Sequence, residues 1–288
     1  MMIRIQSPKL RWSDGLAYLA LAAWALFVIF PLFWIGAMSL KRQMDIFAYP
    51  PKFFDFVPTL DNYLGVFGLL GGADEASATF GRHFANSLFI VGAAIMVTII
   101  LGTMAAYALA RLRFPGRGTV AFMLILVRMV PILTVLLPLY VLYRNTGLYN
   151  TYQGLILAYL FVGLPFYTWL VRGHVDAVPI EIEEAARIDG CNTVQMLFIV
   201  VVPVMLPGII SAALLASIYM WNNFLFALIL AGPDLAPVST QLLNYLGYSS
   251  NYGNLAAACV VTTAPVVAAG FFIQKYILAG LSSGAVKG

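Results

Sequence analysis

Long runs without Asp, Glu, Lys or Arg fill most of this chain. A helix needs about 20 apolar residues to cross the roughly 30 Å hydrocarbon layer of a membrane. Six segments meet this requirement, and the third carries a charge, Arg128, in its middle. The segments are residues 15–40, 84–110, 118–143, 149–171, 205–231 and 255–279. The pattern predicts an all-α, polytopic membrane protein with six transmembrane helices, organised as a single domain over residues 1–288.

Prolines set the bounds of the later spans, because residues 191–233 are uncharged and longer than one crossing requires. Pro203 and Pro207 should make the start of the fifth span irregular, and Pro233 should end it. Pro131 should kink the third span, as proline does in both gated and static helix bundles.

The N-terminus resembles a signal peptide, because Arg4, Lys9 and Arg11 precede an apolar run. A cleaved apolar core is about 7–15 residues long, whereas the run from Leu16 to Leu40 is much longer. We therefore expect an uncleaved first span.

Composition agrees with this interpretation: 62% of the 288 residues are hydrophobic and 10% are charged, against about 45–50% and 25% in soluble domains. Too little polar chain remains for a soluble catalytic domain, so we expect no enzyme activity in this chain. The formal net charge of +4 is better explained by cytoplasmic loops than by nucleic-acid binding.

The short loops predict the orientation of the chain. Residues 111–117 contain three arginines and no acid, whereas residues 232–254 contain no Lys or Arg. The positive-inside rule places the arginine loop in the cytoplasm. With six spans, both termini are then cytoplasmic, and residues 41–82, 144–150 and 232–254 face outside. The expected location is the bacterial cytoplasmic (inner) membrane, in contact with lipid.

The acids are distributed in a way that bears on energy coupling. All twelve fall in loops or at span edges, whereas proton- or sodium-coupled carriers usually hold such groups inside their spans. The chain also lacks the GxxxxGK[ST] loop that binds ATP phosphates. Cys191 and Cys259 are far apart in sequence and show no metal-binding spacing. We expect no cofactor or metal on this chain, and an energy source in a partner.

Two other classes of function stay open. An ion-coupled secondary transporter, working through unwound backbone, is the alternative, and a structural or sensory membrane subunit is a third class.

A short polar helix is predicted at residues 179–190, inside the longest cytoplasmic loop. Pro179 suits its first turn, Asp176 is a candidate cap, and Gly190 suits its end. Glu183 and Arg187 have the i,i+4 spacing of a pair on one face. Two interpretations stay open, namely a lever that docks on another protein and an amphipathic linker on the membrane surface.

The segment Glu184-Ala-Ala-Arg-Ile-Asp-Gly190, followed by Val200-Val-Val-Pro203, resembles the EAA signature of bacterial ABC importer permeases. Asn86-Ser-Leu, the segment 106–116, Trp221-Asn-Asn-Phe and the C-terminal tail resemble the carbohydrate branch, of the maltose type with six spans. The resemblance implies a type I ABC importer permease fold. It also implies a coupling helix, seated in an ATPase subunit, formed by Glu184, Ala185, Ala186, Arg187, Asp189 and Gly190.

The same resemblance implies a heteromeric complex. It comprises a second homologous permease subunit, a dimer of ATPase subunits that binds ATP and Mg, and an extracytoplasmic solute-binding protein facing residues 232–254. The tail at Lys287 and Gly288 would reach the ATPase dimer.

Four residues are candidates for the translocation path. Arg128 is costly inside a membrane unless it faces a cavity or a partner. Trp221, Asn222 and Asn223 combine an aromatic face with amides that suit sugar hydroxyls. Hydrogen bonding between spans explains the same residues equally well.

Overall fold

The computed structural model describes residues 12–70, 75–246 and 251–284, and every regular element within them is helical. The first six helices are α1 (Trp12–Ser39), α2 (Gln43–Ile46), α3 (Asp61–Val66), α4 (Glu75–Arg111), α5 (Arg117–Met129) and α6 (Ile132–Thr146). The next three are α7 (Tyr152–Ala177), α8 (Ile180–Ile188) and α9 (Thr193–Gln195), followed by a π-helical segment, Met196–Val201. The remainder are α10 (Val202–Trp221), α11 (Phe224–Leu230), α12 (Val238–Gln241), a 3₁₀ turn (Leu242–Leu246) and α13 (Tyr252–Gly284).

Five stretches of helix in the described residues are long and apolar enough to cross a membrane, and the α5–α6 pair makes a sixth if it is counted as one broken span. The pair is bent by 97°. The bend falls at Pro131, where the sequence predicted a kink in the third span. Val130 adopts an extended conformation (φ −70°, ψ 124°) before Pro131, because the proline ring disfavours helical backbone at the preceding residue.

The fifth span also differs from its predicted bounds of 205–231. The helix begins at Thr193, continues through the π-helical segment and ends at Trp221, and α11 is a separate short helix. Pro203 does not delay the start: it directly follows the π-helical segment, where the α-helical hydrogen-bond pattern is already interrupted. The break falls at Asn222 and Asn223, where the Asn223 side chain caps the new helix by accepting from the Phe226 backbone N–H.

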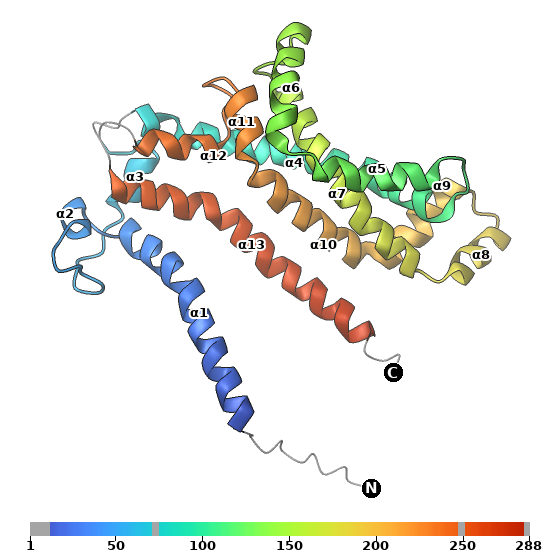
Figure 1. The fold of residues 1–288 in the computed structure, drawn as a ribbon, viewed down its shortest axis with the longest axis horizontal. Helices are drawn as coiled ribbons and strands as arrows, with labels where there is room; N and C mark the ends of the chain where they lie inside the picture. Colours follow the sequence, from blue (N-terminus) through green and yellow to red (C-terminus); the bar gives the residue numbers. More distant parts are fainter. Residues whose placement is uncertain (1–11, 71–74, 247–250, 285–288) are drawn as a thin grey trace.

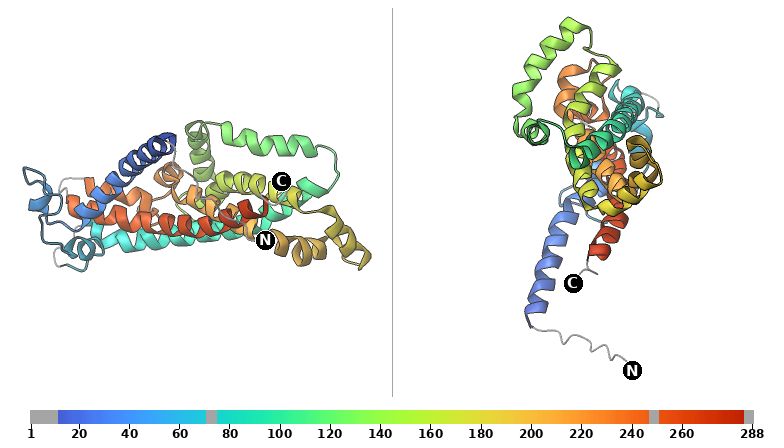
Figure 2. Two further views of the ribbon diagram at one scale, coloured as in Figure 1. Left: turned by 90° about the horizontal axis from the view of Figure 1, so that it is seen from below. Right: turned by 90° about the vertical axis from the view of Figure 1, so that its right-hand side faces the viewer.

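The helices form an elongated bundle whose core lies around α4 and α7, with α10 and α13 alongside (Figures 1 and 2). One buried apolar cluster includes Phe80, Tyr159 and Phe226, and a second includes Tyr167 and Met205. Helix α1 diverges from this bundle, and none of its most apolar stretch is buried. Such a face must be covered by lipid or by another protein.

The two ends of the bundle carry different elements. Helix α8 lies at one end, and α2, α3 and α12 lie near the other (Figure 2). The loop that contains α8, predicted to be cytoplasmic, and the loops that contain α2, α3 and α12, predicted to be outside, therefore lie toward opposite ends. We call the end with α8 the inner end and the opposite end the outer end.

Candidate functional site

Helix α8 is a short polar helix whose two ends are set by its sequence. It follows Pro179 and ends before Gly190, whose φ of +88° favours glycine. These bounds match the predicted helix. Asp176 does not cap it, because no side chain caps its first turn and Asp176 lies 3.8 Å from Arg172 in the preceding helix.

Glu183 is the buried acid of α8, with 3% of its surface exposed. Its Oε1 atom accepts a hydrogen bond of 2.6 Å from Nε of Arg111, and its Oε2 atom accepts one of 3.0 Å from the Tyr107 hydroxyl. The predicted pair with Arg187 is therefore wrong. The carboxylate turns toward the bundle because α4 presents a cation and a hydroxyl there, whereas Arg187 is exposed.

Arg111 connects α8 to a second helix as well. Its Nη2 atom donates to the backbone carbonyls of Val175 and Val178, at 2.8 and 2.6 Å, where α7 ends. The Val175 carbonyl also accepts from the Val178 backbone N–H at 3.1 Å. Carbonyls at a helix C-terminus lack the full set of intrahelical partners, so a cation there supplies hydrogen bonds and opposes the negative end of the helix dipole. In the sequence, Arg111 is recognisable only as one of the three arginines of a short loop. Its i,i+4 spacing from Tyr107 was the signal that places both side chains on one face.

The remaining residues of the predicted coupling helix divide between two faces of α8. Ala186 is buried against the bundle. Glu184, Ala185, Arg187, Asp189 and Gly190 are exposed. Ile188 is 87% exposed, which is unusual for an isoleucine outside lipid. The outward face of α8 thus combines an acid, a small residue and an apolar side chain, and a partner protein would cover it.

A new helix, α9, begins after α8. Asn192 accepts from the backbone of Gln195, and the Gln195 side chain accepts from the backbone N–H of Asn192, which is a complete capping box. The predicted ATPase-contacting tail, Lys287 and Gly288, lies outside the described residues.

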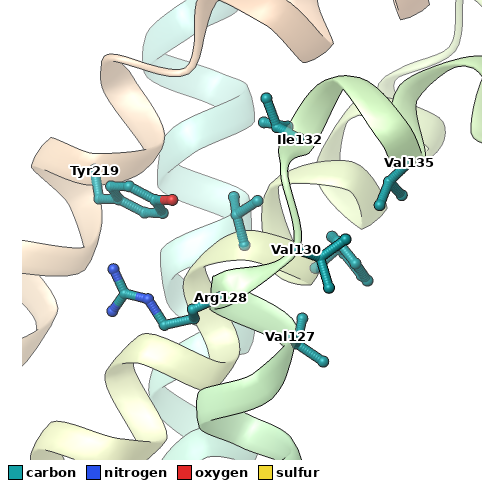
Figure 3. Close-up of a pocket in the computed structure, with 8 residues that line it drawn as sticks. Val127, Arg128, Val130, Ile132, Val135 and Tyr219 are labelled. Atoms are coloured by element: carbon teal, nitrogen blue, oxygen red, sulfur yellow. The ribbon is translucent and has the colours of Figure 1, made fainter.

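Arg128 lies at the bend between α5 and α6, beside a small pocket (Figure 3). Its guanidinium carbon is 4.1 Å from the ring centre of Phe166 and 5.2 Å from that of Tyr219. No carboxylate in the described part of the chain pairs with it. The cation is exposed, and stacking on aromatic faces leaves the edge of its guanidinium available for hydrogen bonds.

Trp221, Asn222 and Asn223 do not form one site. The indole N–H of Trp221 donates to the carbonyl of Thr262 in α13 at 3.1 Å, and the ring packs edge-on against Phe84. Asn223 is buried as the cap of α11. Only Asn222 is exposed. Interhelical bonding thus accounts for Trp221 and capping accounts for Asn223, while Asn222 lies three residues after Tyr219.

No group of three or more His, Cys, Asp or Glu side chains within the described residues is arranged to hold a metal ion. The site consists instead of two surfaces. One is the outward face of α8, and the other is the exposed surface of Arg128, Phe166, Tyr219 and Asn222, which we call the Arg128 surface.

A bundle of helices long and apolar enough to cross a membrane, with a short polar helix at one end, defines a multi-pass membrane protein. The chain belongs to the family described as binding-protein-dependent transport system inner membrane component, which it matches over residues 98–283. It is therefore a transport subunit of the membrane, as the sequence resemblance predicted.

Three named permease proteins are similar to this chain over nearly its whole length. A trehalose transport system permease protein of Mycobacterium tuberculosis is 34% identical over 266 residues, covering 91% of this chain and 93% of the relative. A sulfoquinovosyl glycerol transport system permease protein of Agrobacterium fabrum is 33% identical, covering 90% and 89%. A diacetylchitobiose uptake system permease protein of Streptomyces coelicolor is 31% identical, covering 99% and 93%.

Solved structures show the same fold. A chain from a bacterial ABC transporter that imports the acidic polysaccharide alginate has a TM-score of 0.78 at 23% identity, covering 94% of this chain and 99% of that chain. A chain from the inward-facing MetNI methionine ABC transporter has a TM-score of 0.57 at 20% identity, covering 69% and 95%. The fold is thus that of an ABC importer permease.

Proposed function

We propose that this chain is the permease subunit of an ATP-driven importer and forms half of the translocation path for a carbohydrate, such as an oligosaccharide, glycoside or polyol. The observation that carries the proposal is α8, a polar helix fixed to the bundle by Glu183 with its other face exposed at Glu184, Ala185 and Ile188. Relatives named for trehalose, sulfoquinovosyl glycerol and diacetylchitobiose transport support the substrate class.

The exposed face of α8 is the proposed seat of an ATPase subunit dimer, which binds ATP and Mg and performs the hydrolysis. Glu184, Arg187 and Asp189 supply charges there, and Ala185 lets a partner approach closely. Closure of the ATPase dimer would move α8. Because α8 is held to α4 and α7 through Arg111, this movement would rock the bundle between inward- and outward-facing states.

The other partners follow from the uncovered surfaces. A second, homologous permease subunit would face the Arg128 surface across the translocation path and cover part of α1, with lipid on the remainder. An extracytoplasmic solute-binding protein would dock on the outer end. In this proposed arrangement the chain lies in the bacterial inner membrane, with α8 and both termini in the cytoplasm.

The Arg128 surface is the proposed contribution of this chain to the path. Phe166 and Tyr219 offer aromatic faces to sugar CH groups, and Arg128 offers hydrogen-bond donors to hydroxyls. The Asn222 amide nitrogen donates to the Ile218 carbonyl at 2.9 Å, so Asn222 would offer its amide oxygen as an acceptor. The position at the α5–α6 break allows these groups to be reached from the bend rather than from the lipid face.

The test is uptake and ATP hydrolysis by the assembled transporter in proteoliposomes, with Glu184→Arg compared with Asp176→Arg. Both reversals add positive charge at an exposed position near the inner end, but only Glu184 lies on α8. We expect Glu184→Arg to lose hydrolysis stimulated by the loaded solute-binding protein, together with uptake, and Asp176→Arg to keep both. Normal coupling in Glu184→Arg would overturn the docking role, and ion-driven uptake by the isolated chain would favour a secondary carrier.

A further inference from the structure

Helix α4 extends from the outer end of the bundle to the inner end without interruption. It contains 37 residues and no proline, which corresponds to about 55 Å at 1.5 Å per residue. Figure 2 shows it running along most of the length of the bundle. A straight helix packed along α7 transmits displacement with little bending, because its hydrogen-bond ladder has no break.

At the outer end, α4 holds the loop that follows α11. The His83 ring donates through Nε2 to the carbonyl of Pro233 at 2.8 Å, and the Asn86 amide donates to that of Asp234 at 2.9 Å. The Ser87 hydroxyl accepts from the backbone N–H of Val238 at 2.8 Å. His83, Asn86 and Ser87 are all buried. Three side chains close together on α4 therefore hold residues 231–241, which we call the outer loop, against the helix.

At the inner end, α4 holds α8. Arg111, its last residue, and Tyr107, one turn earlier, share the carboxylate of Glu183. The Tyr107 hydroxyl also lies 3.5 Å from the sulfur of Met196, at the start of the π-helical segment. The exposed fractions of the Arg111 and Glu183 side chains are 14% and 4%, so this ion pair is little screened by solvent.

The covalent route between the same two regions is less direct. From α8 the chain passes through α9, the π-helical segment and α10, and then through the break at Asn222 and Asn223 before α11 reaches the outer loop. A π-helical segment and a break are places where a helix can bend. The side-chain contacts of α4 provide the stiffer connection.

We propose that α4 is the rigid element that couples the outer loop to α8. Binding of the solute-binding protein at the outer end would then affect the ATPase at the inner end, and the reverse. His83 and Asn86 are positioning residues at one end, and Arg111, Tyr107 and Glu183 are positioning residues at the other. This inference rests on the proposed function, which supplies the two partners.

The experiment measures the rate of ATP hydrolysis by the reconstituted transporter with and without sugar-loaded solute-binding protein. The readout is the stimulation ratio, which is the rate with this protein divided by the rate without it. The variants are Asn86→Ala, Glu183→Gln and the double variant, with Arg113→Gln as the control. Arg113 is an exposed arginine two residues beyond Arg111. Tyr107→Phe, which removes one hydroxyl, replaces Glu183→Gln if the latter fails to assemble.

We expect each single variant to lower the stimulation ratio by about fivefold or more, the lower end of typical coupling between sites. Asn86 and Arg111, the partner of Glu183, lie about 37 Å apart along α4. Unrelated effects of the Asn86 and Glu183 substitutions on the ratio would therefore multiply. If both positions act through α4, the stimulation ratio of the double variant should be no lower than that of the more strongly affected single variant. Arg113→Gln should have the same ratio as the unmodified protein.

Ratios unchanged in the single variants, or effects that multiply in the double variant, would overturn the coupling role of α4 and leave the proposed function intact. Absence of stimulation in the unmodified complex would overturn the proposed function itself. The two failures are thus distinguishable.

Discussion

Arg111 and Glu183 form an ion pair with 2.6 Å between Nε and Oε1, which joins the last turn of α4 to helix α8. The pair is nearly enclosed, and each partner has further bonds, to Tyr107 on one side and to two carbonyls of α7 on the other. A buried pair with this many partners fixes the orientation of α8 on the bundle, since removing either charge leaves the other unsatisfied. The orientation that it fixes is the one that exposes Glu184.

The neighbouring acids Glu183 and Glu184 should respond differently to truncation. Glu183→Ala leaves the Arg111 cation buried without its partner, which costs about 3–5 kcal/mol. Glu184→Ala removes an exposed side chain and should change stability by about 0.5 kcal/mol or less. Melting temperatures of the purified transporter measure the difference. Equal melting temperatures would show that the Arg111–Glu183 pair does not hold α8.

Gly102 and Gly92, both on α4, form a matched pair for testing helix packing. A methyl group at Gly102 would overlap the ring of Tyr167 in α7, whereas one at Gly92 would meet nothing within 4 Å. We expect Gly102→Ala to destabilise the protein by about 1–3 kcal/mol through overpacking. Gly92→Ala should be neutral or slightly stabilising. Thermal unfolding checks both, and a neutral Gly102→Ala would argue against the close α4–α7 contact.

Arg128 should affect uptake without affecting the fold. Arg128→Met removes hydrogen bonds to the transported sugar, each worth about 1.5–3 kcal/mol for a charged donor, so uptake at low substrate concentration should fall about tenfold or more. Arg128→Lys keeps the charge but loses the planar stack on Phe166. Its uptake should lie between that of the unmodified protein and that of Arg128→Met. Transport assays on complexes matched for assembly by size-exclusion chromatography provide the measurement. Full uptake by Arg128→Met would remove this residue from the path.

The candidate site was only partly predictable. The bounds of α8 followed from Pro179 and Gly190 because these residues act on their own local backbone. The pairing of Glu183 did not follow, because Arg187 has the right local spacing while the actual partner is 72 residues away. Trp221 presented the same difficulty, since its partner Thr262 is on another helix.

The sequence by itself determined that this chain is a helical membrane protein and where most of its membrane-crossing helices lie, because burial in lipid depends on the composition of a continuous run. Local backbone chemistry likewise determined the ends of α8. Only the tertiary structure decided that the third span is broken by 97°, that Glu183 faces inward while Glu184 faces outward, and that α4 holds both ends of the bundle. These features depend on contacts between residues far apart in sequence, and no periodic pattern along the chain encodes which helix lies beside which.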